Sequence, residues 1–282
     1  MRIGVVGVGL MGHGMGLNLL KGGHDVKVIA HRNRAPIEDL LSRGAREVGS
    51  LEEIARSSDF ILLCLSSSRI VEQTVSTLKP HLRAGQIIID AGTSEPESTR
   101  RLADGLAPLG IGYADAPMTG GPEQAARAEL GVLCGASPEV YAGILPLLSC
   151  YATTIRHMGP IGSGHAAKLI SNFLVTGMIA LVAQAFDAAR KAGIDWRNLY
   201  EVMLNGSGNS GVLRKMVAPA LDGDFEGYKF ALANAAKDIG YFKELATGLG
   251  LETALAAAVE KVFEEALARG HGQKNVSHLL NL

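Results

Sequence analysis

The hydrophobic positions change their period once along the chain, near residue 162. Before that point, short apolar runs alternate with segments in which apolar residues recur every three or four positions, as in strands that alternate with helices. We predict strands at 2–7, 25–30, 60–65, 86–91, 112–116, 130–134 and 153–157. Helices are predicted after residue 9, at 37–44, from 50, from about 69 to 82, at 99–109 and at 138–148. Strands that alternate with helices predict an α/β domain with a parallel sheet.

After Gly164 the periodicity is helical throughout, with helices predicted at 165–192, 196–204, 211–221, 232–249 and 252–269. The pattern therefore predicts two domains, an α/β domain over 1–162 and an all-helical domain over 163–282. The first of these helices would be roughly 40 Å long at a rise of about 1.5 Å per residue. One small domain does not cover such a helix, so we expect a homodimer or homotetramer.

A glycine motif follows the first strand, in the stretch GVGLMGHGMGLNLLKGG. Gly7, Gly9 and Gly12 have the spacing GxGxxG, between a strand and a helix and ahead of a second strand. The first glycine permits the turn, the second admits a diphosphate and the third lets helix and strand pack closely. With Val8, Leu10 and Met11, these residues predict a Rossmann domain that binds a dinucleotide at the helix N-terminus.

The residues after the second predicted strand indicate which dinucleotide is bound. An acidic residue there would bond the ribose hydroxyls and repel a 2′-phosphate. The chain instead reads AHRNRA, with His31, Arg32, Asn33 and Arg34, and arginine suits a phosphate. We therefore expect NADP(H) to be preferred over NAD(H), unless these arginines only solvate a surface loop.

Polar turns follow several strands at the edge where such sheets bind ligands. Leu65 and Ser66 end one strand, and the serines 66–68 either contact the cofactor or cap the next helix. Thr93 could reach the nicotinamide side of the cofactor. In DAPMTGG, the hydroxyl of Thr119 and the amides of Gly120 and Gly121 could hold a carboxylate, although an ordinary Pro/Gly turn has the same composition.

The segment GPIGSGHAAKLISN opens the long helix, where Lys168 and Asn172 stand one turn apart on the same face. The apolar residues that follow predict burial, which would lower the pKa of a lysine toward neutrality. Lys168 either reaches out to water or passes a proton to and from a substrate oxygen. Further on, Lys237 either covers the cofactor or is a surface charge, and Phe230 is a candidate for the pocket.

Composition excludes several classes of protein. The chain has 282 residues, 47% of them hydrophobic, and a net charge of −1 without a basic run, which argues against nucleic-acid binding. Its three cysteines have no CxxC spacing, so we expect buried thiols and neither a disulfide framework nor a metal site. No signal segment is evident and the longest apolar run, 173–183, is too short to span a bilayer, so we expect a cytoplasmic protein without a membrane partner.

Together these motifs resemble the β-hydroxyacid dehydrogenase family, over the whole chain. The family pattern GxGxMGxxMxxNLxKxG matches residue for residue, DAPVSGG appears as DAPMTGG, GxxGxGxxxKxxxN as GPIGSGHAAKLISN, and KDL as KDI. Thr119 thus replaces the usual serine and Met118 the usual valine, so the pocket shape could differ. The resemblance implies a C-terminal domain like that of 6-phosphogluconate dehydrogenase. It also implies a proton-transfer role for Lys168, a substrate-orienting role for Asn172 and a cofactor contact for Lys237.

The resemblance implies hydride transfer between a nicotinamide cofactor and a small β-hydroxy acid, semialdehyde or 2-oxo acid. Two alternatives stay open. An imine reductase is similar in fold but usually has another residue at the position of Lys168. A dinucleotide-binding scaffold without activity typically loses the lysine or the glycines, and this sequence keeps both.

Overall fold

The computed structural model describes residues 1–31 and 33–282. It divides into two compact units, Met1–Lys168 and Leu169–Leu282. The division falls inside helix α8 (Ser163–Lys191), a few residues beyond the change of period at residue 162.

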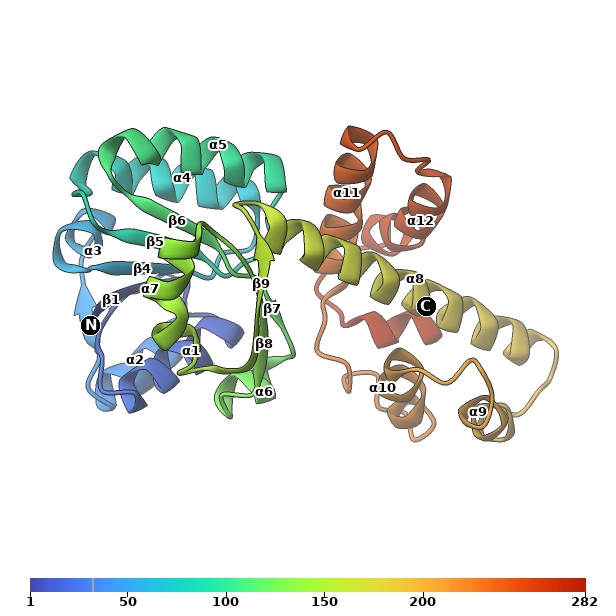
Figure 1. Cartoon of the computed structure of the whole chain (residues 1–282). Helices are drawn as coiled ribbons and strands as arrows, with labels where there is room; N and C mark the ends of the chain where they lie inside the picture. The colour runs from blue at the N-terminus through green and yellow to red at the C-terminus, as the bar shows by residue number, and fades with distance from the viewer. Residues whose placement is uncertain (32) are drawn as a thin grey trace. The chain divides into compact units, whose positions relative to one another are not determined.

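The N-terminal unit is built on a nine-stranded sheet with the order β3-β2-β1-β4-β5-β6-β8-β7, in which β9 also pairs with β8 (Figure 1). The first six of these strands are parallel: β3 (Arg46–Val48), β2 (Asp25–Ile29), β1 (Arg2–Val6), β4 (Phe60–Leu63), β5 (Ile87–Asp90) and β6 (Gly112–Asp115). β8 (Leu130–Gly135) runs antiparallel to β6 and to β7 (Met118–Thr119), and parallel to β9 (Ala152–Gly159). The chain changes direction across the sheet between β1 and β4, which is where such sheets bind ligands.

Helices cover both faces of this sheet (Figure 1). α1 (Leu10–Lys21), α2 (Ala35–Ser42) and α7 (Pro138–Leu148) contribute to one apolar core, and α3 (Leu51–Ser57), α4 (Ser68–Leu78) and α5 (Pro96–Leu106) to another. Successive strand residues serve opposite cores: Leu62 belongs to the first, and Ile61 and Leu63 to the second. A strand buried on both faces must be apolar at every position, which explains the continuous apolar runs in the sequence.

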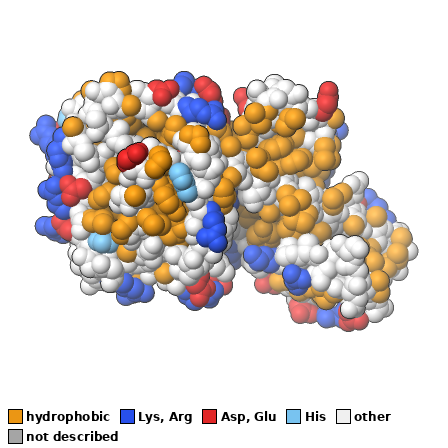
Figure 2. Space-filling model, in the orientation of Figure 1, with side chains coloured by type: hydrophobic (Ala, Val, Ile, Leu, Met, Phe, Trp, Pro, Cys, Tyr) orange, Lys and Arg blue, Asp and Glu red, His pale blue; other side chains and the backbone are white. Residues whose placement is uncertain are grey.

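The C-terminal unit is all-helical, with α8 from Leu169 onward, α9 (Trp196–Leu204), α10 (Gly211–Ala220), α11 (Leu232–Gly248) and α12 (Ala254–Ala268), followed by the 3₁₀ turn η3 (Val276–Leu280). Its core includes Ile179, Phe186, Met216 and Phe263. Figure 2 shows further hydrophobic side chains exposed over α11 and the neighbouring part of α8.

Two predicted helices end earlier than expected. α4 ends at Leu78 and α5 at Leu106, and 3₁₀ turns follow them, η1 (Lys79–His81) and η2 (Ala107–Leu109). Pro80 and Pro108 lie in these turns, and a proline has no N–H to continue an α-helix. Four short elements were not predicted: β3, β7, α6 (Pro122–Ala126) and η3.

The cysteines are all free thiols. Cys134 is buried as predicted, whereas Cys64 and Cys150 are only partly buried, which corrects that expectation. Burial raises the pKa of the Cys64 and Cys134 thiols to about 12. Both therefore stay protonated at neutral pH and behave as apolar side chains.

Candidate dinucleotide site and catalytic residues

The turn between β1 and α1 requires glycine at two positions. Gly7 has a φ of 99°, and a Cβ built on it would lie 2.2 Å from the carbonyl oxygen of Cys64. A Cβ on Gly12 would lie 2.0 Å from the carbonyl oxygen of Gly7. No side chain fits at either position, so the turn, the strand and the helix can pack this closely only with glycine.

Gly9 has a different reason to be glycine. A Cβ on it would meet nothing within 4 Å, so the space in front of this residue is open. Gly9 is also the N-cap of α1, where no side chain caps the helix and no acidic residue occupies the first turn. The first N–H groups and the positive end of the helix dipole therefore face outward, as diphosphate binding requires. The turn thus fits the dinucleotide predicted from the sequence.

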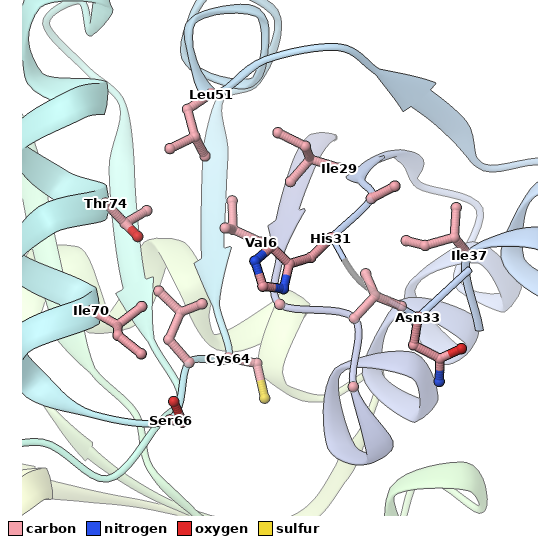
Figure 3. Close-up of a pocket in the computed structure, with 15 residues that line it drawn as sticks. Val6, Ile29, His31, Asn33, Ile37, Leu51, Cys64, Ser66, Ile70 and Thr74 are labelled. Atoms are coloured by element: carbon pink, nitrogen blue, oxygen red, sulfur yellow. The ribbon is translucent and has the colours of Figure 1, made fainter. Parts of the chain in front are cut away.

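A cavity of about 530 Å³ lies beside this turn (Figure 3). The predicted cofactor residues that line it are Gly7, Val8, Gly9, His31, Asn33, Leu65 and Ser66. The others lining it are Val6, Ile29, Ala30, Ile37, Leu51, Cys64, Ile70 and Thr74. Figure 3 shows the His31 ring directed into the cavity, with Ile70 and Thr74 of α4 on the opposite wall. Mostly apolar walls with a few polar groups suit a flat nucleoside.

The three serines after β4 were predicted either to cap the next helix or to contact the cofactor. The hydroxyl of Ser67 accepts the N–H of Ile70 at 3.5 Å and caps α4. The hydroxyl of Ser68 accepts the N–H of Glu95 at 2.8 Å and ties α4 to the next turn. Ser66 is exposed and lines the cavity. Capping and cavity lining therefore both occur, on different residues.

The residues predicted to select NADP(H) have different surroundings in the structure. The Arg34 guanidinium makes two hydrogen bonds to Glu47 of β3, at 2.9 and 3.0 Å. The carboxylate of Glu47 raises the pKa of Arg34. His31 and Asn33 line the cavity, and Arg32 lies outside the described residues. A phosphate at this position would compete with Glu47 for Arg34, a competition that the sequence pattern did not indicate.

The remaining predicted residues of this unit follow β5 and β6. Thr93 is half-buried in the turn after β5. Thr119 is half-buried in β7, and its hydroxyl lies over Gly131 of β8, where a Cβ would be only 2.3 Å away. Gly120 has a φ of 109° and is exposed, whereas the N–H of Gly121 donates to the Gln124 side chain at 2.9 Å. The expectation that both glycine amides are free for a carboxylate therefore needs correction at Gly121.

The start of α8 is bonded to the end of β6. The Asp115 carboxylate accepts the N–H of Gly162 at 2.8 Å and that of His165 at 2.7 Å. Burial raises the pKa of Asp115, although the positive charge of His165 and these N–H groups lower it. Lys168 follows one turn later and is half-buried, less covered than the sequence indicated. Within the N-terminal unit, the lysine and the glycine turn thus belong to the same carboxyl edge of the sheet.

In the C-terminal unit, Asn172 is bound by a residue that sequence reasoning did not assign. Its side-chain amide donates to the Asp238 carboxylate of α11 at 2.6 Å, and both residues are buried. Because a carboxylate only accepts, the amide nitrogen must face Asp238 and the amide oxygen must face away. The only sequence signal for Asp238 is its place after Lys237 in the KDI motif.

Lys237 and Phe230 also belong to the C-terminal unit. The Lys237 ammonium lies 2.9 Å from Asp238 and 5.2 Å from the centre of the Tyr241 ring. Phe230 is half-buried, packs against the helical core and lies 6.3 Å from Tyr228 between ring centres. Among residues 1–31 and 33–282, no group of three or more His, Cys, Asp or Glu side chains could hold a metal ion.

Two family models cover nearly the whole chain. Residues 2–159 match the NAD binding domain of 6-phosphogluconate dehydrogenase. Residues 162–282 match the NAD-binding domain of NADP-dependent 3-hydroxyisobutyrate dehydrogenase. Fold and glycine turn thus define the class, an NAD(P)-dependent oxidoreductase.

Similar proteins narrow the class. The chain is 31% identical to 2-(hydroxymethyl)glutarate dehydrogenase of Eubacterium barkeri over 100% of its own length and 94% of that protein. It is 29% identical to 2-hydroxy-3-oxopropionate reductase of Escherichia coli, over 99% of its own length and 96% of that protein. A crystal structure of 3-hydroxyisobutyrate dehydrogenase from Salmonella typhimurium superimposes with a TM-score of 0.88 at 26% identity, covering 99% of this chain and 98% of that one. The chain belongs to the β-hydroxyacid dehydrogenase family.

Proposed function

We propose that this chain transfers a hydride between NADP(H) and a small carboxylate-bearing β-hydroxy acid, or the corresponding semialdehyde or 2-oxo acid, with Lys168 as general acid and base. The observation that carries the proposal is the bonding of the α8 N-terminus to Asp115. It ties the helix that bears Lys168 to the edge of the sheet that bears the glycine turn. The family model over residues 162–282 also supports a reaction of this kind.

The proposed chemistry needs a proton donor where negative charge develops. When bound, the nicotinamide ring supplies or accepts the hydride at the substrate carbon. In reduction, the Lys168 ammonium stabilises the charge on the carbonyl oxygen and protonates it. In oxidation, the neutral amine accepts the hydroxyl proton. Lys168 is half-buried, so its ammonium is partly shielded from bulk water, where an electrostatic interaction with a substrate oxygen is stronger.

Other residues would orient the substrate. The amide oxygen of Asn172, turned away from Asp238, can accept a hydrogen bond from a substrate hydroxyl or from an ammonium. Thr119 and Gly120 would hold the substrate carboxylate, and Gly121 would join them if Gln124 gave up its bond. Phe230 would limit the size of the substrate.

The preference for NADP(H) is supported by the absence of any acidic residue over 30–34. The Arg34 and Glu47 pair offers a test. Arg34→Gln should raise the Kd of NADPH by about tenfold and leave that of NADH nearly unchanged, the loss expected for one charged contact to a phosphate. Glu47→Gln should have the opposite effect and lower the Kd of NADPH, because it frees the Arg34 guanidinium to bind the phosphate. Equal effects on both cofactors, measured by fluorescence titration, would contradict the assignment.

Reductive aminases and imine reductases share the fold, as the reductive aminase from Aspergillus terreus does at 22% identity with a TM-score of 0.65. The experiment that separates the candidates is a matrix of NADPH and NADH against carbonyl acids, cyclic imines and ketone–amine pairs, followed at 340 nm. The panel includes glyoxylate, succinic semialdehyde, methylmalonate semialdehyde, 3-hydroxyisobutyrate and 2-hydroxy-3-oxopropionate. Turnover of the acids supports the proposal. Turnover of imines alone, or binding without turnover, would support the alternatives.

A further inference from the structure

Three buried polar side chains of the N-terminal unit have no task in the chemistry proposed above. Asp90 ends β5, Asp115 ends β6, and His165 lies in the first turn of α8. All three have 0% of their surface exposed. A charged or polar group in this position is costly unless partners compensate it, so the contacts of the three residues must account for their presence.

The contacts of His165 fix its orientation. Its Nδ1 lies 2.7 Å from the hydroxyl of Thr99. The same hydroxyl lies 3.1 Å from the carbonyl oxygen of Glu95, to which it can donate, so Thr99 connects the ring to the backbone of α5. The other nitrogen, Nε2, has no hydrogen-bond partner in the described part of the chain.

Each carboxylate is held by neutral donors. Asp90 accepts the N–H of Gly92 at 2.9 Å and the hydroxyl of Ser94 at 2.8 Å. Asp115 accepts its two N–H groups from the start of α8. These donors compensate part of the cost of burying the two side chains.

The imidazole ring lies between them. Nε2 is 3.8 Å from Asp90 and Nδ1 is 3.9 Å from Asp115. The buried ring therefore brings side chains of β5, β6, α5 and α8 together at one point.

The backbone around His165 leaves α8 little freedom to shift. A Cβ on Gly164 would lie 2.3 Å from the carbonyl oxygen of Leu133 and 2.6 Å from that of Asp115. The helix start thus touches the backbone of two strands directly. Lys168 follows His165 by three residues, a spacing that places both on neighbouring positions of one helix face.

We propose that His165 is a positioning residue. Its buried ring, bonded to Thr99 and lying between the two carboxyl groups, fixes the first turn of α8 against the sheet, and with it the direction in which Lys168 leaves the helix. This inference rests on the proposed function of Lys168. It adds that the reaction depends on a side chain that touches neither substrate nor cofactor.

The test is a comparison of His165→Ala with His165→Gln. His165→Ala should lower kcat on the order of 10²-fold, the scale expected when a reacting group is misplaced by about 1 Å. The Kd of NADPH should stay within about twofold of the wild-type value, because the glycine turn is untouched. The kinetic isotope effect with deuterated NADPH should rise, since the chemical step becomes slower. The amide of His165→Gln can still donate to Thr99, so the kcat of this variant should be about tenfold higher than that of His165→Ala.

A matched control separates positioning from stability. Ile144→Ala removes a fully buried side chain of α7 in the same unit, away from α8. It should lower the melting temperature but leave kcat per cofactor-binding chain and the isotope effect unchanged. If His165→Ala does not fold, Thr99→Val removes the partner of Nδ1 with little change of shape, and its kcat should fall by roughly tenfold.

The two proposals fail differently. A folded His165→Ala variant with wild-type kcat and isotope effect would overturn the positioning role. If His165→Ala does not fold, a wild-type kcat in Thr99→Val would overturn it instead. If Lys168→Ala keeps wild-type turnover, the proposed function itself fails. Loss of turnover in Lys168→Ala together with full turnover in His165→Ala would remove only the present inference.

Discussion

At the residue scale, the orientation of one amide matters for the proposed chemistry. Asn172 is buried, and its nitrogen is fixed by the Asp238 carboxylate at 2.6 Å. The amide can present its oxygen only while the partner is a pure acceptor. Asp238 also lies 2.9 Å from the Lys237 ammonium, so one carboxylate orients two predicted site residues.

Replacing this carboxylate should therefore affect turnover. Asp238→Asn keeps the shape but lets the Asn172 amide flip, because an amide both donates and accepts. We expect kcat to fall by about tenfold, the loss of about one hydrogen bond in the transition state. Steady-state kinetics with the substrate found in the panel measures it. Asp222→Asn, which removes an exposed partner of Arg197, is the control and should change nothing; equal kinetics in both variants would contradict the role of Asp238.

The sequence motifs name Lys168, Asn172 and Lys237 as candidate site residues but give no sign of the buried residues around them. Asp90, Asp115 and His165 come together because β5 and β6 are neighbours and α8 returns to their ends. Strand order determines such contacts, and spacing along the chain does not show it. The Arg34 and Glu47 pair has the same cause, since Glu47 lies on a strand that was not predicted.

At the element scale, the glycine turn is the feature that the sequence predicted most fully. The motif predicts a separate reason for glycine at each position. In the structure, other backbone atoms approach Gly7 and Gly12 closely, whereas the space in front of Gly9 is open. The motif contains this information because most of its constraints are local, as at Gly12, whose nearest atom is the carbonyl oxygen of Gly7. The contacts from elsewhere in the chain come from Cys64 and Leu65, just after β4.

Because the space around Gly9 and Gly12 differs, substitutions at the two positions should affect cofactor affinity and stability differently. Gly9→Ala should fold normally and keep its melting temperature, because the added methyl meets no protein atom. The methyl would fill the space in front of the helix N-terminus, so the Kd of NADPH should rise more than about tenfold. Calorimetric titration and thermal melts measure the two effects. Gly12→Ala, whose methyl clashes with backbone, should lose stability as well; a Gly9→Ala variant with unchanged affinity would contradict the role of the turn.

The elements that were not predicted are short. β3 has three residues, with the sequence REV, and only one apolar side chain. β7 has two residues and α6 has five. Such segments are too short for a period to appear, and pairing with β2 and β8 makes strands of β3 and β7. The long helices after residue 163 were predicted within a few residues, because many turns repeat the same pattern.

At the scale of the whole molecule, α8 is more apolar than the sequence analysis allowed. It has 29 residues and a mean hydropathy of 1.8 in its most apolar window, and of the described helices it alone is long and apolar enough to cross a membrane. The run 173–183 was too narrow a measure, because the uncharged polar residues at its two ends, Asn172 and Gln184, do not interrupt a span. Only 33% of that window is buried within the chain.

The exposed part of α8 continues into an apolar groove in the C-terminal unit. The groove has a volume of about 350 Å³ and is lined by residues of α8 and α12 without a charged side chain: Phe173, Leu174, Gly177, Met178, Ala180, Leu181, Gln184, Leu255, Ala258, Val259 and Val262. Leu174, Leu181 and Leu255 are each about two-thirds exposed. We infer that a second copy of this chain covers the groove, since an uncharged patch matches itself across a twofold axis.

A charge in the groove should therefore break the assembly. Leu181→Glu should shift the protein from dimer or tetramer to monomer in light scattering after size exclusion, because a buried carboxylate would lack a partner. Leu249→Glu is the control, since Leu249 is similarly exposed but does not line the groove. A wild-type monomer would contradict the inference. Binding of the wild-type protein to lipid vesicles without self-association would favour a membrane surface instead.

The most direct test of the account is the turnover of Lys168→Ala with its best carbonyl acid and NADPH. The account assigns proton transfer to this amine, so kcat should fall by roughly 10²-fold to 10⁴-fold, the contribution expected of a general acid. The Kd of NADPH should hardly change, because the glycine turn and its cavity lie elsewhere in the N-terminal unit. Turnover close to that of the wild-type enzyme, in a variant that binds NADPH normally, would contradict the account.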